Sequence, residues 1–170
     1  MKKLSLEGLN FSTTEVNIKD KVMTITLDRP EKKNAMNNVM MNEINYLLAY
    51  AKQEKDIRVV VFAANGDVFC AGADLSRTES KSNVPRLENS DDISLSLRHL
   101  YKPVICKIQG PVLAGALLIV SNATHAIAVD EATFSAPEIH RGLWPFMVMA
   151  GLFRVMPKSC LLYTSPSPRD

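Results

Sequence analysis

The stretch "RVVVFAANGDVFCAGADL", residues 58–75, combines an apolar run, a turn-forming segment and small residues that lead to an acid. The run over residues 57–64 has the length and the β-branched content of a buried strand. Ala71, Gly72 and Ala73 carry no bulky side chain, so the backbone beyond this strand can face a cleft and present N–H groups there. The sequence therefore predicts a strand that ends in exposed main-chain donors.

A second junction of small residues lies at "QGPVLAGALL", residues 109–118. Gly115 stands between two alanines near a predicted helix start, where backbone N–H groups point outward and the helix dipole is positive. Each junction by itself is typical of an ordinary packing or turn glycine. If the two junctions converge, their N–H groups can bind one oxygen atom.

On both sides of these two junctions, predicted strands and helices alternate along the chain, which indicates an α/β fold with helix-covered strands. The polar segment over residues 76–92 is expected to be a surface loop. The expected elements are a strand at 21–28, a helix from Asn37 or Asn38 to about Lys55, the strand at 57–64, a short helix through Leu97 and Leu100, a strand at 104–108, a buried helix at 112–123, a strand at 125–130 and a helix from Pro145 to about Met156.

Composition narrows the class of protein. The 170 residues suit one globular domain, and a net charge of +2 with both signs interspersed favours neither a nucleic-acid nor a membrane partner. Three cysteines without C-x-x-C spacing favour a reducing cytoplasm over a disulfide framework or a zinc site. The N-terminus lacks the long apolar stretch of an export signal, and no run reaches the length of a membrane span.

Other catalytic chemistries lack their motifs. His99, His125 and His140 have no i, i+4 partner for a metal, so no metal site is expected. Cys70 has no base beside it and is interpreted as a small packing residue. There is no G-x-S-x-G, Walker or G-x-G-x-x-G sequence, which argues against hydrolase, nucleotidase and dinucleotide-binding functions.

Two further stretches complete a family pattern: "DRPEKKNAM" at 28–36 and "FSAPEIHRGL" at 134–143. Together with the two glycine-containing junctions, and in the same order, they resemble the enoyl-CoA hydratase/isomerase (crotonase) family from about Val16 to Met156. The resemblance implies a crotonase-like spiral of ββα units that lacks the C-terminal helical part. Residues 1–157 are then an incomplete acyl-CoA-binding core, and residues 158–170, a Ser/Pro-rich segment, are expected to be a non-native tail.

The resemblance also implies roles for individual residues. Ala73 and Gly115 match the two backbone donors of an oxyanion hole for a thioester carbonyl. Hydratases of the family carry two glutamates, of which Glu138 matches the second, whereas Leu118 stands in place of the first. One base suffices to move a double bond, so isomerisation is favoured over hydration. The residues that match coenzyme A contacts are Lys33, Ala35, Ala71, Asp74 and Leu75.

The expected substrate is an acyl-CoA thioester, with no separate cofactor because coenzyme A belongs to the substrate. The expected enzyme is a lyase or isomerase of the cytoplasm that assembles as a homotrimer or hexamer at full length. The alternatives are an inactive fragment and a non-catalytic module that binds acyl-CoA or RNA. RNA binding requires a basic stripe, which the sequence does not contain.

Overall fold

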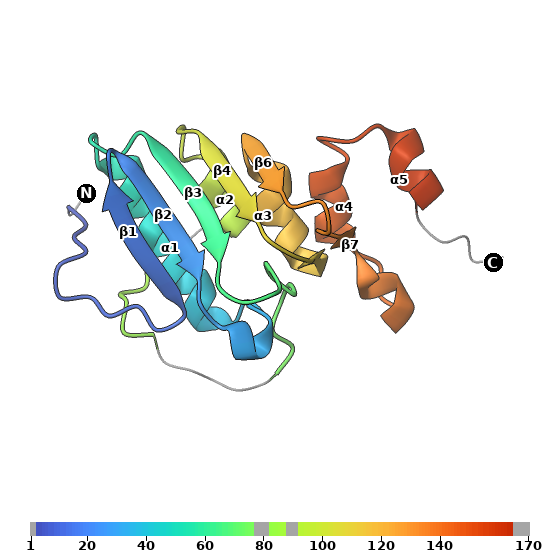
Figure 1. Cartoon of the computed structure of the whole chain (residues 1–170), viewed down its shortest axis with the longest axis horizontal. Helices are drawn as coiled ribbons and strands as arrows, with labels where there is room; N and C mark the ends of the chain where they lie inside the picture. Colours follow the sequence, from blue (N-terminus) through green and yellow to red (C-terminus); the bar gives the residue numbers. More distant parts are fainter. Residues whose placement is uncertain (1–2, 77–81, 88–91, 165–170) are drawn as a thin grey trace.

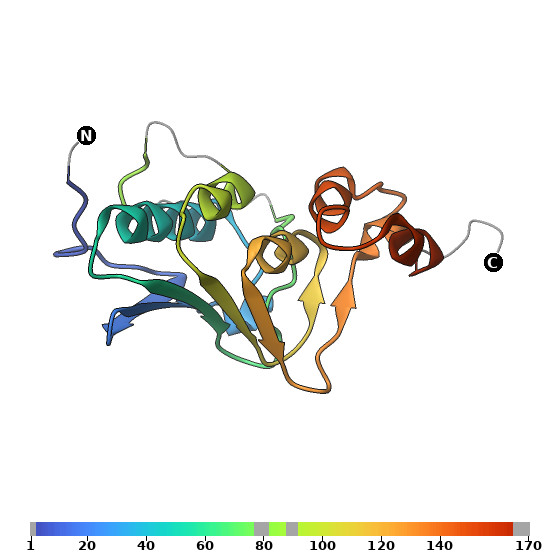
Figure 2. The ribbon, with the colours of Figure 1, turned by 90° about the horizontal axis from the view of Figure 1, so that it is seen from above.

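The computed structural model describes residues 3–76, 82–87 and 92–164, in which a five-stranded sheet carries helices on one face (Figures 1 and 2). Its strand order is β1-β2-β3-β4-β6, with β1 antiparallel to β2 and every other pair parallel. The strands are β1 (Thr14–Lys19), β2 (Val22–Leu27), β3 (Val59–Ala64), β4 (Val104–Ile108) and β6 (His125–Ala128).

The core lies between this sheet and the helices, because one face of each central strand is apolar. Met23, Ile25 and Leu27 of β2 are fully buried, and Val60 and Phe62 of β3 lie on the same side. Figure 2 shows the covering helices in a row above the sheet. They are α1 (Asn38–Gln53), α2 (Ile93–Arg98) and α3 (Leu117–Asn122).

A smaller, two-stranded parallel sheet extends the fold toward the C-terminus. It pairs β5 (Val112–Leu113) with β7 (Phe134–Ser135), and each strand runs into a 3-10 helix. The remaining elements are η1 (Pro30–Lys32), η2 (Ala114–Ala116), η3 (Pro137–Arg141), α4 (Phe146–Leu152) and α5 (Lys158–Thr164). No helix in the described ranges is long and apolar enough to cross a membrane.

Most sequence-predicted elements are present, with a few differences. The N-terminal strand β1 was not predicted, although Val16 and Ile18 alternate in it. The helix expected over 112–123 is divided into β5, η2 and α3, because Val112 N–H bonds Thr133 O at 2.8 Å and holds the first residues extended. The last predicted helix ends at Leu152.

Two segments fall partly outside the described residues. Of the expected surface loop at 76–92, residues 77–81 and 88–91 are not described, and residues 82–87 contain neither helix nor strand. At the C-terminus the structure has the helix α5, where the sequence showed no periodicity, and Leu161 is buried in it. That residues 158–170 are non-native stays a prediction.

Candidate active site

The segment after β3 pairs with two neighbours in succession. Cys70 first pairs with Val112, and Leu113 N–H donates to Cys70 O at 2.9 Å. Gly72 then turns the chain with φ +88°, a left-handed conformation that favours glycine. A Cβ at Gly72 would lie 2.7 Å from Ala114 Cβ and 3.0 Å from Gly115 N, so only glycine fits this close approach.

Beyond Gly72 the chain pairs with the segment that precedes α1. Met36 N–H donates to Gly72 O at 2.7 Å, and Asp74 N–H donates to Met36 O at 2.9 Å. In such a parallel bridge the residue between the two bonds directs its own N–H to the opposite side. The Ala73 N–H therefore points away from this partner strand. Gly115 lies beside it, since a Cβ there would be 3.8 Å from Ala73 N.

Neither the Ala73 N–H nor the Gly115 N–H donates a hydrogen bond to any described residue. For Gly115 this follows from its position in the first turn of η2, where backbone donors have no partner within the helix. The two junctions of small residues predicted from the sequence thus lie side by side, each with a free backbone donor. An oxygen atom that carries negative charge suits such a pair of donors. Their role in binding one stays a prediction.

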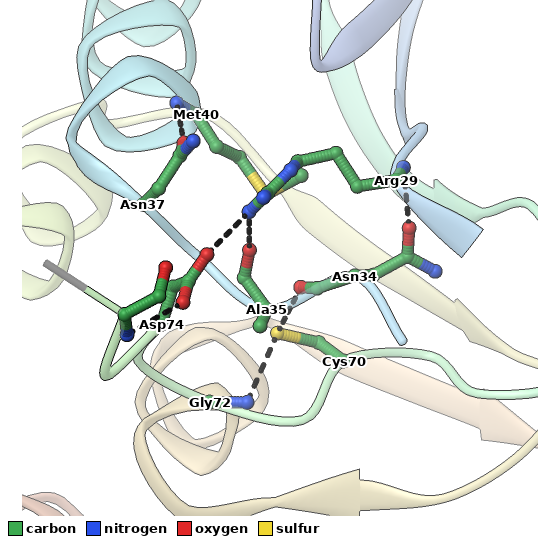
Figure 3. Close-up of polar contacts among 9 residues, drawn as sticks. Arg29, Asn34, Ala35, Asn37, Met40, Cys70, Gly72 and Asp74 are labelled. Atoms are coloured by element: carbon green, nitrogen blue, oxygen red, sulfur yellow. Dashed lines mark hydrogen bonds and ion pairs between the residues drawn. The ribbon is translucent and has the colours of Figure 1, made fainter. Parts of the chain in front are cut away.

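The pairing of residues 33–36 with residues 71–74 forms a short ladder, and Arg29 contacts both of its segments (Figure 3). Its guanidinium Nη1 donates to Ala35 O at 2.5 Å and to Asp74 Oδ2 at 3.1 Å. Hydrogen bonds from Ser76, together with the Arg29 guanidinium, lower the pKa of Asp74 to about 2. Asp74 is therefore a carboxylate at neutral pH and holds its neighbours as an acceptor.

Asn34 fixes the turn from β2 to α1 from within. Its fully buried side chain donates to Asn65 O and Val68 O, both at 2.8 Å, and accepts from Arg29 N–H. The backbone carbonyl of Asn34 accepts a hydrogen bond from the Cys70 thiol at 3.0 Å (Figure 3). Burial raises the pKa of Cys70 to about 11, so this thiol stays neutral and serves packing, as its small size in the sequence indicated.

The five residues that match coenzyme A contacts all lie in or beside this ladder. Ala71 N–H donates to Lys33 O at 2.9 Å, and the Lys33 side chain is exposed. Ala35 and Asp74 are joined through Arg29. Leu75 follows at the end of the ladder with 70% of its surface exposed, which leaves an apolar side chain available to a ligand. Their contacts with a substrate remain a prediction.

Glu138 reaches the same end of the fold through the small sheet. Leu113 of β5 pairs with Ser135 of β7 in parallel register, so the chain leaves both strands at the same edge. Gly115 follows the first strand and Glu138 the second, at the start of η3. The Glu138 Oε2 atom is buried and has no hydrogen-bond partner among the described residues. A buried polar atom without a partner in the protein is available to a ligand.

Leu118 lies at the contact between α3 and α4. A Cβ at Gly151 would lie 2.9 Å from Leu118 Cδ2 and 3.0 Å from Ser121 Oγ, so α4 approaches this leucine closely at Gly151. The position matched to the first glutamate of hydratases is thus occupied by a half-buried leucine at the contact between two helices. It offers no polar atom to a water molecule.

Arg29, Asn34 and Met36 are the site residues that sequence reasoning missed. All three lie in "DRPEKKNAM", the stretch quoted for the family pattern, but they were not assigned a function. Their partners are distant along the chain: Arg29 and Asp74 are 45 residues apart. The asparagine itself is the sequence signal that could have been noticed, because Asn tolerates a left-handed turn, and Asn34 has φ +53° in the structure.

Comparison with known proteins identifies the family of this chain. Residues 17–161 match the sequence profile of the enoyl-CoA hydratase/isomerase family, and the chain belongs to that family. It is 34% identical over 135 residues to a probable enoyl-CoA hydratase, echA12, of Mycobacterium bovis, covering 72% of this chain and 46% of the relative. It is 32% identical over 144 residues to a trans-2-decenoyl-[acyl-carrier-protein] isomerase of Streptococcus mutans, covering 81% and 55%.

Solved structures confirm the crotonase fold. An enoyl-CoA hydratase/isomerase from Mycobacterium paratuberculosis superimposes with a TM-score of 0.79 at 26% identity, over 91% of this chain and 62% of that one. An enoyl-CoA hydratase/isomerase from Legionella pneumophila gives a TM-score of 0.73 at 32% identity, with the same coverage. The chain spans about half the length of the curated relatives it matches, 46% and 55% in the two cases above.

Proposed function

We propose that this protein acts on acyl-CoA thioesters by stabilising an enolate, with the N–H groups of Ala73 and Gly115 as the oxyanion hole. The observation that carries the proposal is the close approach of these two amides, each of which has its N–H free of any described acceptor. Donors fixed by the fold need no reorganisation as charge develops on the thioester oxygen, and removal of one such donor typically costs about 3 kcal/mol of barrier.

Glu138 is the proposed base. Its carboxylate removes a proton from C2 of a 3-enoyl thioester, and the electron pair moves onto the thioester oxygen to form a dienolate. The same carboxylate, now protonated, returns the proton to C4, and the double bond moves to the 2,3 position. One residue thus acts first as a base and then as an acid, and no proton is gained or lost. The unpartnered Oε2 of Glu138 supports this role.

Isomerisation is favoured over hydration because of Leu118. Addition of water requires a second group that orients and deprotonates the water. The leucine at this position packs against α4 and has no polar atom to offer. The similarity to a decenoyl isomerase supports the same choice, although other relatives are named as hydratases.

The proposal also covers the coenzyme A contacts, the cellular compartment and the oligomeric state of the protein. Lys33, Ala35, Ala71, Asp74 and Leu75 are proposed to bind the coenzyme A part of the substrate. Three cysteines without C-x-x-C spacing support a reducing compartment, and we place the protein in the cytoplasm. Assembly of the complete protein into a homotrimer or hexamer is proposed, since large apolar side chains of the C-terminal part are exposed in this chain.

The test is a pair of rate measurements on a version of the chain that is extended to the length of its relatives. We expect conversion of a 3-enoyl-CoA to the conjugated 2-enoyl-CoA, with slow hydration of a 2-enoyl-CoA. Glu138→Gln keeps the size of the side chain but removes its basicity, so both activities should be lost while acyl-CoA binding persists. Efficient hydration by the unaltered protein would overturn the preference for isomerisation.

A further inference from the structure

We infer that Arg29 is a positioning residue that holds the Ala73 N–H in the direction needed to polarise a thioester, an inference that rests on the proposed function. Arg29 lies between the end of β2 and the start of η1. Its guanidinium makes no described hydrogen bond to Ala73 or Gly115. It acts through the residues on either side of the bridge between Met36 and Ala73.

The bridge that orients Ala73 is short. It consists of two backbone hydrogen bonds, from Met36 N–H to Gly72 O and from Asp74 N–H to Met36 O. It is an isolated bridge outside the regular strands, and among the described residues one further backbone bond, from Ala71 N–H to Lys33 O, joins the same two segments. A slip of one residue would turn the Ala73 N–H toward Met36 and away from Gly115.

Arg29 contacts both segments that form this bridge, and this pair of contacts is the Arg29 clasp. It binds Ala35 O, the residue before Met36, and Asp74 Oδ2, the residue after Ala73 (Figure 3). The side chains of Arg29 and Asp74 are only 14% and 11% exposed, which limits screening of the ion pair by water. Both hydrogen bonds leave Nη1, whose two N–H groups are fixed in the plane of the guanidinium, whereas a lysine ammonium rotates about its stem.

The carboxylate is itself held in place. Asp74 Oδ1 accepts a hydrogen bond from Ser76 N–H at 2.9 Å, while Oδ2 accepts from Arg29. Asn34 Oδ1 in turn accepts from Arg29 N–H at 2.8 Å and fixes the backbone from which the guanidinium extends. The clasp is therefore anchored at both ends, which is what a positioning device requires.

The first experiment measures amide hydrogen exchange in the 170-residue chain, and it does not depend on any substrate. Arg29→Met should speed exchange of the Met36 and Asp74 amides about tenfold or more relative to amides of β2 and β3. Lys102→Met is the control, because Lys102 binds carbonyls at the end of α1, away from the bridge. If both variants change these two amides equally, Arg29 contributes only general stability and the inference is wrong.

The second experiment measures polarisation of a bound thioester. Cinnamoyl-CoA absorbs at longer wavelength when its carbonyl is polarised, so the extended version should shift this band to the red on binding. We expect Arg29→Met to lose most of the shift with a dissociation constant changed less than about tenfold, Arg29→Lys to regain part of it, and Lys102→Met to retain it.

The outcomes separate this inference from the function on which it rests. A full red shift in Arg29→Met, with a normal shift in the unaltered protein, would overturn the positioning role alone. Absence of any shift in the unaltered protein would overturn the oxyanion hole and, with it, the role of Arg29. Loss of the shift in Arg29→Met but not in Lys102→Met supports both.

Discussion

At the scale of single residues, Leu118 is the side chain that most sharply separates two chemistries. Its side chain lies beside Gly151 at the contact between α3 and α4. By the family resemblance, hydratases carry a glutamate at this position. In the proposed mechanism, the preference for isomerisation over hydration therefore rests on this one side chain, which is half-buried.

Leu118→Glu is expected to raise hydration of a 2-enoyl-CoA, since a positioned acid or base contributes about 10²- to 10⁴-fold to a rate. The same change should lower the free energy of unfolding by about 1 to 3 kcal/mol, because a polar group enters an apolar contact. Leu118→Gln is the matched control, with similar size and no basicity. Equal hydration by the two variants would contradict a catalytic carboxylate at this position.

The lowered pKa of Asp74 predicts that the free energy of unfolding depends on pH in the acid range. Its folded pKa of about 2 lies below the ordinary value of 3.8, so its contribution is present above pH 4 and is lost as the pH falls from 4 toward 2. Denaturant midpoints at pH 2 and pH 5 should therefore differ more for the unaltered chain than for Asp74→Asn. An equal difference in both proteins would show that the carboxylate gains nothing from folding.

At the scale of elements, helix α1 depends on how its ends are satisfied. Asn37 caps the start, with its side chain accepting from Met40 N–H at 2.9 Å. At the other end the Lys102 ammonium donates to Ala51 O and Glu54 O, both at 2.6 Å, and to Ile57 O at 2.7 Å. A residue from the loop before β4 thus completes the C-terminus of α1.

Lys102→Met should lower the free energy of unfolding by about 1.5 to 3 kcal/mol, the range for hydrogen bonds to a charged group. Lys52→Met, on the exposed face of the same helix, is the control, and its cation–π contact with Tyr101 is expected to contribute at most about 1 kcal/mol. Thermal or denaturant unfolding measures both. A smaller loss for Lys102→Met than for Lys52→Met would contradict the capping role.

The sequence predicted those elements whose signal is local. Alternation in β2, the apolar run of β3 and an asparagine cap at position 37 or 38 are all local signals, and the structure confirms each, with Asn37 as the cap. The division of 112–123 into strand and helix was missed, since it depends on pairing with Thr133 and Cys70.

In the candidate site, too, features with a local sequence signal were predicted and features that depend on distant residues were missed. Small residues at positions 71–73 and 114–116 marked both junctions, and the structure places them side by side. The Arg29 clasp was missed because neither of its acceptors is specified by a local pattern.

At the scale of the whole molecule, the two ends of the fold differ in how well they are covered. The N-terminal half encloses its core between sheet and helices (Figure 2). From β6 onward, large apolar side chains are half or more exposed, at 50% to 74% of their surface. They are Ile127, Phe134, Leu143, Trp144, Phe146, Met147 and Val155.

The 170-residue chain is therefore expected to self-associate, since an exposed apolar surface of this kind is stabilised by contact with a second copy. The double change Phe146→Ser and Met147→Ser should raise the monomer fraction in size-exclusion chromatography. Tyr101→Ser, at a remote position that is 82% exposed, should not. A sharp monomer peak from the unaltered chain, with one cooperative thermal transition, would show that this surface needs no cover.

Exchange of the C2 protons of an acyl-CoA with D₂O, followed by NMR, tests the central claim most directly, because it detects enolate formation without requiring hydration or isomerisation. In a version extended to the length of its relatives, we expect exchange that Glu138→Gln abolishes and that Gly115→Pro, which lacks the N–H, slows by about 10²- to 10³-fold. Acyl-CoA binding should persist in Glu138→Gln. Exchange at an undiminished rate in Glu138→Gln, or none in the unaltered protein, would contradict the account.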